Sequence, residues 1–336
     1  MSKLFDCIIN KKHSFIPVWF MRQAGRYLPE FREIRKENQN FIKLCLNSDL
    51  VTDITLQPMN RFDLDAAIIF SDILMIPYGL GQRVEFKKGF GPELGDLDLE
   101  KTNSIEPKDF INRLSPVYEG MRKVKEKIKN KTLVGFIGAP WTLLVYMLNK
   151  KSPKKDFDIN KINKNKILTE KIIEKIVESA CLHADKQIEA GADVIQIFDS
   201  WAGLLPEKEL VNYCYTPTLK IVEHIKKSKI PVICFPRGIK KNYFNFCEMV
   251  RPDCINIDYE IDPRWIKEKI NGIAIQGGLD PKILLTDKKN IKKNIEKYLK
   301  IFSDVPYIFN LGHGILPETK PEMIEYAIKV LREYKK

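Results

Sequence analysis

Four arginines lie close together near the start of the chain, in the segment PVWFMRQAGRYLPEFREIR of residues 17–35. The chain has 12 arginines and 44 lysines, so this window holds a third of the arginines and none of the lysines. Arginine differs from lysine because its planar guanidinium binds a carboxylate or a phosphate through two parallel hydrogen bonds. The window therefore predicts a binding site for a ligand that carries several acidic groups.

The positions of the four arginines suggest different roles. Arg22 and Arg26 flank Gly25 directly after an apolar stretch, where a ligand can approach the backbone. Arg32 and Arg35 fall on a helical stretch that also contains glutamates, and surface arginines often pair with glutamates at helical spacing. We therefore expect Arg22 and Arg26 to bind the ligand and Arg32 to be a surface residue.

Three further side chains could take part in chemistry. Asp72 follows the apolar run AAIIFS and precedes ILMI, so its carboxylate needs a partner that offsets its desolvation. That partner is either the N–H groups of a ligand or nearby backbone amides in a turn. His313 lies between two glycines in LGHGI, which permits close approach of a ligand. Tyr146 lies in the helical stretch APWTLLVYML, where spacing alone favours a core position.

Eight short apolar runs recur along the chain, and a stretch with helical spacing follows each of them. Strands that alternate with helices indicate a parallel sheet, and eight such units predict an α/β protein, a single (β/α)8 TIM barrel domain over residues 1–336. Two doubly wound domains are the alternative. Loop insertions are expected at 79–115 and 149–166. The predicted strands are 16–20, 66–70, 133–137, 194–198, 231–235, 254–257, 273–276 and 307–310.

Polar residues follow these runs, at the barrel end where active sites lie. The segments read MRQAGR, SDIL, GAPW, DSWAG, PRG, DYE, GGLDP and LGHG. Turn formation explains most of their Gly, Pro and Asp residues. It does not explain why Arg22, Arg26 and Arg237 gather at one rim.

Composition argues against several classes of protein. The net charge of +12 comes from lysines scattered over polar stretches, so we expect a solvated surface and no nucleic-acid partner. No apolar run approaches the roughly 18 residues of a membrane span. The start MSKLFDCIINKKH shows no targeting signal, and seven dispersed cysteines without a C-x-x-C pair fit a reduced protein. We therefore expect a cytoplasmic protein without a structural metal. No nucleotide, zinc-protease or serine-hydrolase motif is present, and nothing in the sequence requires a cofactor.

Together these segments resemble the uroporphyrinogen decarboxylase family. The resemblance rests on residues 17–35 and on IIFSDILMIPYGLG, GFIGAPWTLLVYML, IQIFDSWAGLL, FPRG, QGGLDP and FNLGHGILPETKPE, in the family's order, and it extends from about Pro17 to Glu322. It implies a cofactor-free enzyme of haem and tetrapyrrole biosynthesis. Such an enzyme converts uroporphyrinogen III to coproporphyrinogen III by decarboxylating four acetate side chains. The family fold is the (β/α)8 barrel, and its members are usually homodimers with a deep cleft in each subunit.

The resemblance also assigns roles to residues. Asp72 matches the central aspartate that accepts the pyrrole N–H groups, and Asp72, Arg22 and Tyr146 are the implied catalytic residues. The proton donor stays open between Arg22 and a water or substrate carboxyl group. The residues that match substrate-binding positions are Arg22, Gln23, Arg26, Arg35, Asp72, Tyr146, Ser200 and His313, with Ile68, Phe136 and Phe198 as apolar contacts.

Three other interpretations remain open from the sequence. A corrinoid-linked methyltransferase of the same superfamily would bind zinc through a His-x-Cys pair, but the fifth run reads Val232-Ile233-Cys234 without that histidine. A barrel that binds a phosphorylated metabolite could use GGLDP, LGHG and Arg237. A nucleic-acid-binding module would rest on the basic charge alone.

Overall fold

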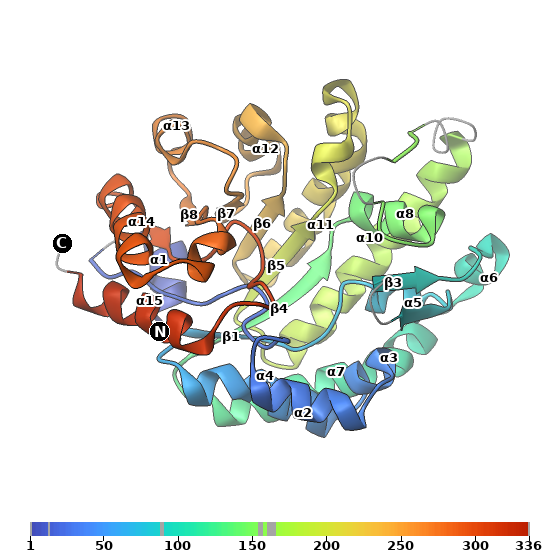
Figure 1. Ribbon diagram of the computed structural model, residues 1–336. Helices are drawn as coiled ribbons and strands as arrows, with labels where there is room; N and C mark the ends of the chain where they lie inside the picture. The colour runs from blue at the N-terminus through green and yellow to red at the C-terminus, as the bar shows by residue number, and fades with distance from the viewer. Residues whose placement is uncertain (1, 13, 88–90, 154–156, 160–165, 335–336) are drawn as a thin grey trace.

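A curled parallel sheet forms the centre of the molecule (Figure 1). The computed structural model describes residues 2–12, 14–87, 91–153, 157–159 and 166–334, and within these ranges seven strands pair in the order β1-β4-β5-β6-β7-β8-β9. All their pairings are parallel, so their carboxyl ends meet at one edge. The strands are β1 (Ala66–Ile68), β4 (Thr132–Gly138), β5 (Val194–Asp199), β6 (Val232–Pro236), β7 (Cys254–Ile257), β8 (Ala274–Gly277) and β9 (Tyr307–Ile308).

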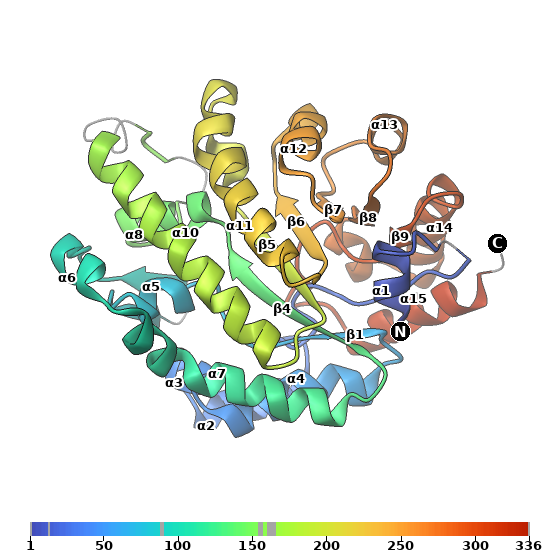
Figure 2. The ribbon, with the colours of Figure 1, turned by 180° about the vertical axis from the view of Figure 1, so that it is seen from behind.

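Helices cover the outside of the curled sheet, as the two opposite views show (Figures 1 and 2). The strands are apolar along nearly their whole length because one face packs on these helices and the other faces the interior. The outer helices are α4 (Ser48–Arg61), α7 (Pro107–Lys127), α10 (Lys166–Glu189), α11 (Thr216–Lys226), α12 (Tyr243–Val250), α13 (Pro263–Lys269), α14 (Lys288–Ile301) and α15 (Pro321–Glu333). Further helices are α1 (Lys3–Ile8), α2 (Pro29–Glu37), α3 (Phe41–Cys45), α5 (Met75–Gly79), α6 (Leu99–Ser104) and α8 (Pro140–Asn149).

Seven of the eight predicted strands are confirmed, but the first, at 16–20, is not a regular strand. Within the described residues this segment forms one isolated bridge, from Val18 to Phe309 beside β9. Pro17 has no N–H to donate, and the N–H of Val18 donates to the Asp65 carboxylate (2.8 Å) instead of to a neighbouring strand. The sheet is therefore curled, with this segment between β9 and β1, and regular pairing does not continue around a complete ring.

The two predicted insertions differ in what they contain. The first, 79–115, carries an antiparallel hairpin of β2 (Val84–Lys87) and β3 (Gly91–Leu94), which the sequence reading did not anticipate. Each of these strands has only four residues, too few for a clear alternating pattern. In the second insertion, 149–166, Lys151 bridges to Glu93, while residues 154–156 and 160–165 lie outside the described residues.

A polar layer fills part of the interior of the curled sheet. The indole Nε1 of Trp19 donates to Oε1 of Gln276 (2.9 Å), and Nε2 of Gln276 donates to Oε1 of Gln196 (3.0 Å) and Oδ1 of Asn256 (2.7 Å). All four side chains are fully buried, so these hydrogen bonds offset the cost of burying their polar atoms. The layer ties the first segment to β5, β7 and β8.

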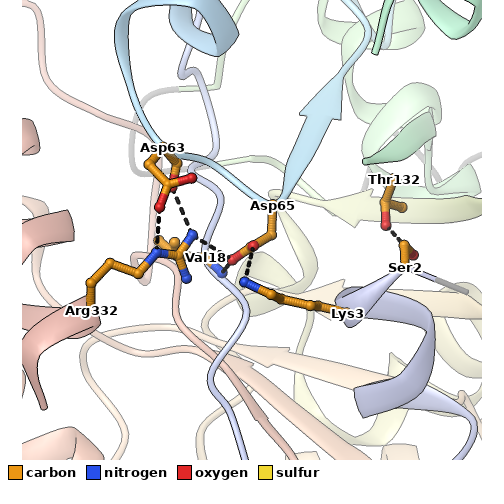
Figure 3. Close-up of polar contacts among 7 residues, drawn as sticks. All are labelled: Ser2, Lys3, Val18, Asp63, Asp65, Thr132 and Arg332. Carbon is orange, nitrogen blue, oxygen red and sulfur yellow. Dashed lines mark hydrogen bonds and ion pairs between the residues drawn. The ribbon is translucent and has the colours of Figure 1, made fainter. Parts of the chain in front are cut away.

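Ion pairs join the chain ends at the amino-terminal edge of the sheet (Figure 3). Arg332 of α15 donates from Nε to Oδ2 of Asp63 (2.7 Å) and from Nη2 to Oδ2 of Asp65 (3.0 Å). Lys3 of α1 pairs with the other oxygen of Asp65 (3.2 Å). Asp65 therefore connects α1, α15 and the start of β1 at the edge opposite the candidate site.

Candidate active site

The polar residues that follow the strands come together at the carboxyl edge of the sheet. The pKa of Arg22 is shifted electrostatically by Asp72, Tyr146, Arg26 and Arg237. The pKa of His313 is shifted in the same way by Arg22 and Arg237. Groups interact this way only when they are close, so segments far apart in the sequence converge here. The residues that converge are Arg22, Arg26, Asp72, Tyr146, Arg237 and His313.

Arg22 is held in an unusual backbone conformation. Its φ is 60°, in the left-handed region that residues other than glycine rarely adopt. Its side chain passes directly over Gly314, where an added Cβ would lie 2.4 Å from Cδ and 2.7 Å from Cγ of Arg22. Gly314 is thus glycine because the stem of Arg22 occupies the space of a side chain. Backbone strain of this kind is typical of functional sites.

Arg22 combines exposure to water with crowding by protein atoms. Its surface is partly accessible, yet desolvation lowers the pKa of its guanidinium, and Arg26 and Arg237 act in the same direction. The Asp72 carboxylate opposes this effect because it favours the charged form. The guanidinium is therefore a cation in a partly desolvated setting, where binding a carboxylate is most favourable.

Asp72 is a half-buried carboxylate close to Arg22 and Tyr146. Desolvation raises its pKa to about 6, against the opposing effects of the Leu74 N–H and of Arg22. The N–H of Leu74 donates to Oδ1 (2.9 Å), so the residue does cap a turn, one of the two roles the sequence left open. A carboxylate can accept about four hydrogen bonds. Among the described residues, the Asp72 carboxylate accepts this one. Asp72 therefore retains acceptor capacity for N–H groups of a ligand.

Two polar side chains near Arg22 are uncharged at neutral pH. Burial raises the pKa of the Tyr146 hydroxyl, and the Asp72 charge acts in the same direction. Burial lowers the pKa of His313 to about 3, assisted by the nearby Arg22 and Arg237. Tyr146 also packs edge-on against Trp201, with ring centroids 6.1 Å apart. Both side chains can thus act as neutral hydrogen-bonding partners.

Apolar side chains from adjacent strands lie at the same edge. Phe136 at the end of β4 and Phe198 of β5 meet edge-to-face with ring centroids 5.6 Å apart. Ile68 ends β1, the neighbour of β4, and Phe136 and Ile68 are almost completely buried. Phe198 and the following Ser200 are half-buried. These three apolar side chains thus come from three neighbouring strands, β1, β4 and β5.

The structure places Gln23 away from any solvent-accessible surface. The side chain is completely buried; its Oε1 accepts the N–H of Phe20 (3.1 Å) and its Nε2 donates to the carbonyl of Ala66 (3.1 Å). These contacts use its amide on main-chain groups. The resemblance had assigned Gln23 to the substrate, and its observed surroundings favour a different role.

The remaining arginines of the first window bind main-chain carbonyls of their own segment. Arg32 is exposed and donates to the carbonyls of Arg26 (3.0 Å) and Tyr27 (3.1 Å), and it does so in place of the expected pairing with a glutamate. Arg35 donates to the carbonyl of Gln39 (3.2 Å) and lies over the ring of Phe41 at 5.4 Å. Arg32 is thus a surface residue, as expected, and Arg35, in the last turn of α2, binds the connection from α2 to α3.

A buried network behind the turn after β5 was not anticipated from the sequence. The hydroxyl of Thr142 donates to Oδ1 of Asp199 (2.6 Å) and accepts the N–H of Trp201 (3.0 Å). Burial raises the pKa of Asp199 to about 6. The only sequence signal was an aspartate directly after a strand, which is indistinguishable from a turn residue. The network fixes the turn that carries Ser200.

The structure bears on two of the alternatives. Among the described residues, no three His, Cys, Asp or Glu side chains are arranged to hold a metal ion, and Cys234 is a buried thiol whose pKa burial raises. In the glycine pair of β8, an added Cβ at Gly277 would lie 2.9 Å from Oδ1 of Asn256, and one at Gly278 would lie 2.6 Å from the Tyr298 ring. Close packing therefore accounts for these glycines without a phosphate.

No helix in the described ranges is long and apolar enough to cross a membrane.

The fold and the site define a parallel α/β protein in which Arg22 lies close to the Asp72 carboxylate and to two further arginines, after the carboxyl ends of its strands. The chain belongs to the uroporphyrinogen decarboxylase family, because the family model described as Uroporphyrinogen decarboxylase (URO-D) matches residues 1–334. A uroporphyrinogen decarboxylase of Rickettsia bellii (strain RML369-C) is 46% identical over 323 residues, 95% of each chain. One of Rickettsia felis (strain ATCC VR-1525 / URRWXCal2) is 41% identical over 331 residues, 97% of this chain and 95% of that protein.

Solved structures with similar folds have much lower sequence identity. A methyltransferase from Methanosarcina mazei superposes with a TM-score of 0.79 at 17% identity, over 98% of this chain and 97% of that one. A B12-independent methionine synthase from Shewanella sp. W3-18-1 gives a TM-score of 0.54 at 10% identity, over 96% and 94% of the two chains. These similarities show the fold alone.

Proposed function

We propose that this protein decarboxylates the four acetate side chains of uroporphyrinogen III to methyl groups and releases coproporphyrinogen III. The observation that carries this proposal is the charge pattern around Arg22, which lies close to the Asp72 carboxylate and to two further cations, Arg26 and Arg237. A ligand with many carboxylates and a few converging N–H groups complements such a site. Membership of the uroporphyrinogen decarboxylase family supports the same substrate.

Different side chains of the site bind different parts of the substrate. Asp72 accepts the pyrrole N–H groups, which converge on one acceptor when the flexible macrocycle is domed. Arg22 and Arg26, with Arg35 from the last turn of α2, bind the acidic side chains through paired hydrogen bonds. The neutral partners Tyr146, Ser200 and His313 bind further carboxylates, and Ile68, Phe136 and Phe198 contact the face of the macrocycle.

The reaction needs a place for the electrons that the departing carboxylate leaves behind. Protonation of the pyrrole α-carbon, next to the carbon that bears the acetate, creates an iminium cation that is conjugated with the acetate-bearing carbon. The C–C bond electrons flow into it as carbon dioxide leaves, and a second proton then converts the exocyclic methylene to a methyl group as the ring carbon loses its own proton. Asp72 stabilises the cation because its fixed negative charge lies where positive charge develops. No metal or organic cofactor enters this sequence.

The catalytic roles of Arg22 and Tyr146 follow from their position beside Asp72. Arg22 orients the reacting acetate. Desolvation lowers the pKa of its guanidinium and so makes it a stronger acid than an exposed arginine. Tyr146 supplies a hydroxyl next to the same carboxylate. His313 is neutral in the free protein, so it serves as a hydrogen-bonding partner and not as the acid.

The proposal includes the arrangement of the whole chain. Residues 1–336 form one domain, in which residues 17–21 act as an irregular eighth strand that completes a (β/α)8 barrel. The bridge from this segment to Phe309 beside β9 and its hydrogen bonds with Asp65 before β1 support that view. The protein works in the cytoplasm as a homodimer, which sedimentation of the purified protein can check.

The decisive experiment is incubation of the purified protein with anaerobically reduced uroporphyrinogen III, followed by chromatography of the oxidised products. We expect a series from hepta- to tetracarboxylate porphyrins that depends on enzyme concentration. An Asp72→Ala variant, purified in parallel, controls for spontaneous or contaminating decarboxylation. Failure of the wild-type protein to form these species would refute the proposed function.

A further inference from the structure

We propose that the side chains of Gln23 and Asp65 replace main-chain pairing between residues 17–21 and the start of β1, and that this seam sets the position of Arg22 relative to Asp72. The word seam denotes the contact between residues 17–21 and residues 65–66. The inference deepens the proposed function, since it names positioning residues for the same reaction.

Residues 17–21 bond to their two neighbours alternately, as an extended strand does. On the β9 side the contacts involve odd-numbered residues. The N–H of Phe309 donates to the carbonyl of Pro17 (2.8 Å), that of Trp19 to the carbonyl of Phe309 (3.4 Å), and that of Met21 to Oδ1 of Asn310 (3.0 Å). This side of the segment is therefore held largely by the main chain.

On the β1 side the contacts involve even-numbered residues and mostly use side chains. The N–H of Val18 donates to Oδ2 of Asp65 (2.8 Å), and the N–H of Asp65 returns to the carbonyl of Val18 (2.9 Å). The N–H of Phe20 donates to Oε1 of Gln23 (3.1 Å), whose Nε2 donates to the carbonyl of Ala66 (3.1 Å). The Gln23 carboxamide thus stands between two main-chain groups that would pair directly in a regular ladder.

This insertion has a geometric consequence. Directly paired strands lie about 4.8 Å apart, whereas two hydrogen bonds with an amide between them require a wider separation. The segment pairs directly with residue 65 at Val18 but through Gln23 at Phe20, so the seam widens toward the carboxyl edge. Arg22 follows Phe20 by two residues, and Asp72 follows β1 on the other side of the seam.

The surroundings of Gln23 fit a positioning role. The side chain of Gln23 is completely buried. The main-chain carbonyl of Gln23 accepts a hydrogen bond from the hydroxyl of Tyr27 (2.8 Å). All these contacts fix the loop from which Arg22 projects over Gly314. Gln23 therefore acts through Arg22 and does not touch the substrate.

The test uses Gln23→Met, which preserves side-chain volume and removes both hydrogen bonds. We expect kcat to fall at least about tenfold and the acid limb of the kcat/KM profile to shift to higher pH. The groups that face Asp72 are Arg22, Tyr146 from α8 and Cys45 from α3. Burial raises the pKa values of Tyr146 and Cys45, so both stay neutral near pH 6 and displacement of Arg22 is what moves the limb.

The matched control is Gln187→Met. Gln187 of α10 is also a buried amide that bonds two main-chain groups, the N–H and the carbonyl of Phe136 (2.9 Å each). Its loss should lower stability to a similar extent but leave kcat and the acid limb close to wild type.

A second variant keeps the proposal testable if Gln23→Met does not fold. In Gln23→Glu an ionised side chain opposes the Ala66 carbonyl, whereas a protonated one can accept from Phe20 and donate to Ala66. We expect its kcat relative to wild type to recover as the pH falls.

One readout does not depend on catalysis. The Asp72 carboxyl can be titrated by carbon-13 NMR in substrate-free protein, assigned by its loss in Asp72→Asn, and its pKa should rise in Gln23→Met. A higher KM with unchanged kcat, acid limb and Asp72 titration would show that Gln23 contacts substrate and would overturn the inference. Absence of decarboxylation by the wild-type protein would instead refute the proposed function, and the NMR titration would still decide the seam.

Discussion

Asp72 illustrates a conflict between stability and function at a single residue. Its folded-state pKa of about 6 lies above the ordinary aspartate value of 3.8, so its contribution to stability is present below pH 3.8 and is lost as the pH rises through 6. At neutral pH the ionised side chain destabilises the fold, by roughly 1–3 kcal/mol. A residue retained at such a cost is expected to serve the reaction.

We therefore predict opposite effects of Asp72→Asn on activity and stability. Turnover should fall at least about 100-fold, because an amide cannot stabilise the iminium cation by charge. The free energy of unfolding should rise at pH 7 and match wild type near pH 4, where both side chains are neutral. Urea denaturation at the two pH values measures this, and equal or lower stability of the variant at pH 7 would contradict it.

Gly314→Ala should disable the site without touching the substrate. The added Cβ would overlap Cδ of Arg22 at 2.4 Å, so Arg22 must move. We expect kcat/KM to fall about 100-fold or more with the fold retained, as circular dichroism can show.

The control for this variant is Gly272→Ala. Gly272 has a φ of 77°, and nothing lies within 4 Å of an added Cβ, so the variant carries backbone strain without displacing a side chain. Its stability should fall by about 1 kcal/mol while activity persists. Equal activities of the two variants would show that Arg22 tolerates displacement.

Residue types at strand ends predicted much of the site, and side-chain direction limited the rest. Asp72 and Arg22 were predicted from chemistry that a turn alone does not need, and the structure brings them together. Gln23 lies in the same motif, but the sequence RQAGR does not reveal that a left-handed Arg22 turns Gln23 into the core. Tyr146 looked like a core residue because helical spacing does not distinguish an interior from a site that opens beside it.

The Thr142 hydroxyl holds the turn after β5, and we expect its removal to affect both stability and activity. In Thr142→Val the methyl group replaces a hydroxyl that joins Asp199 and the N–H of Trp201. Loss of both bonds should lower the free energy of unfolding by about 1–3 kcal/mol and kcat/KM by roughly tenfold, since Ser200 sits on this turn. Chemical denaturation and steady-state kinetics measure the two effects.

Thr218 offers a matched control in α11. It is also buried, and its hydroxyl has no hydrogen-bond partner among the described residues, so Thr218→Val should be neutral or stabilising and fully active. A loss of stability in Thr218→Val equal to that in Thr142→Val would show that burial of the methyl group, and not the network, decides the effect.

At the level of elements, the apolar runs predicted seven strands because parallel strands buried on both faces are continuously apolar. The run at 16–20 shares this composition, yet Pro17 lacks a donor and the bonds of Val18 and Phe20 go to side chains. Gln23 follows the run, and Asp65 is distant from it in the sequence. The composition of the run therefore could not reveal that these two side chains accept its N–H groups. The hairpin of β2 and β3 was missed because its strands are short and partly exposed.

The molecule as a whole responds to acid through buried groups of opposite effect. Asp72 and Asp199, both with a pKa of about 6, favour the folded state when protonated. His183 does the reverse, because burial lowers its pKa to about 3 from an ordinary value of 6.5. It accepts or donates a hydrogen bond with Tyr118 (2.9 Å) far from the site. Acid stability is thus a balance between site and core.

We predict that substitution of His183 isolates one part of the acid side of this balance, which His183 shares with His313, whose pKa burial also lowers to about 3. Its stabilising contribution is present above pH 6.5 and is lost as the pH falls toward 3, because the unfolded chain binds the proton first. His183→Gln keeps a partner for Tyr118 but does not titrate. The stability difference between wild type and this variant should therefore shift by about 2 kcal/mol against wild type between pH 7 and pH 5. Denaturant unfolding at both pH values measures the shift; a difference that stays constant would mean that folding does not change the pKa of His183.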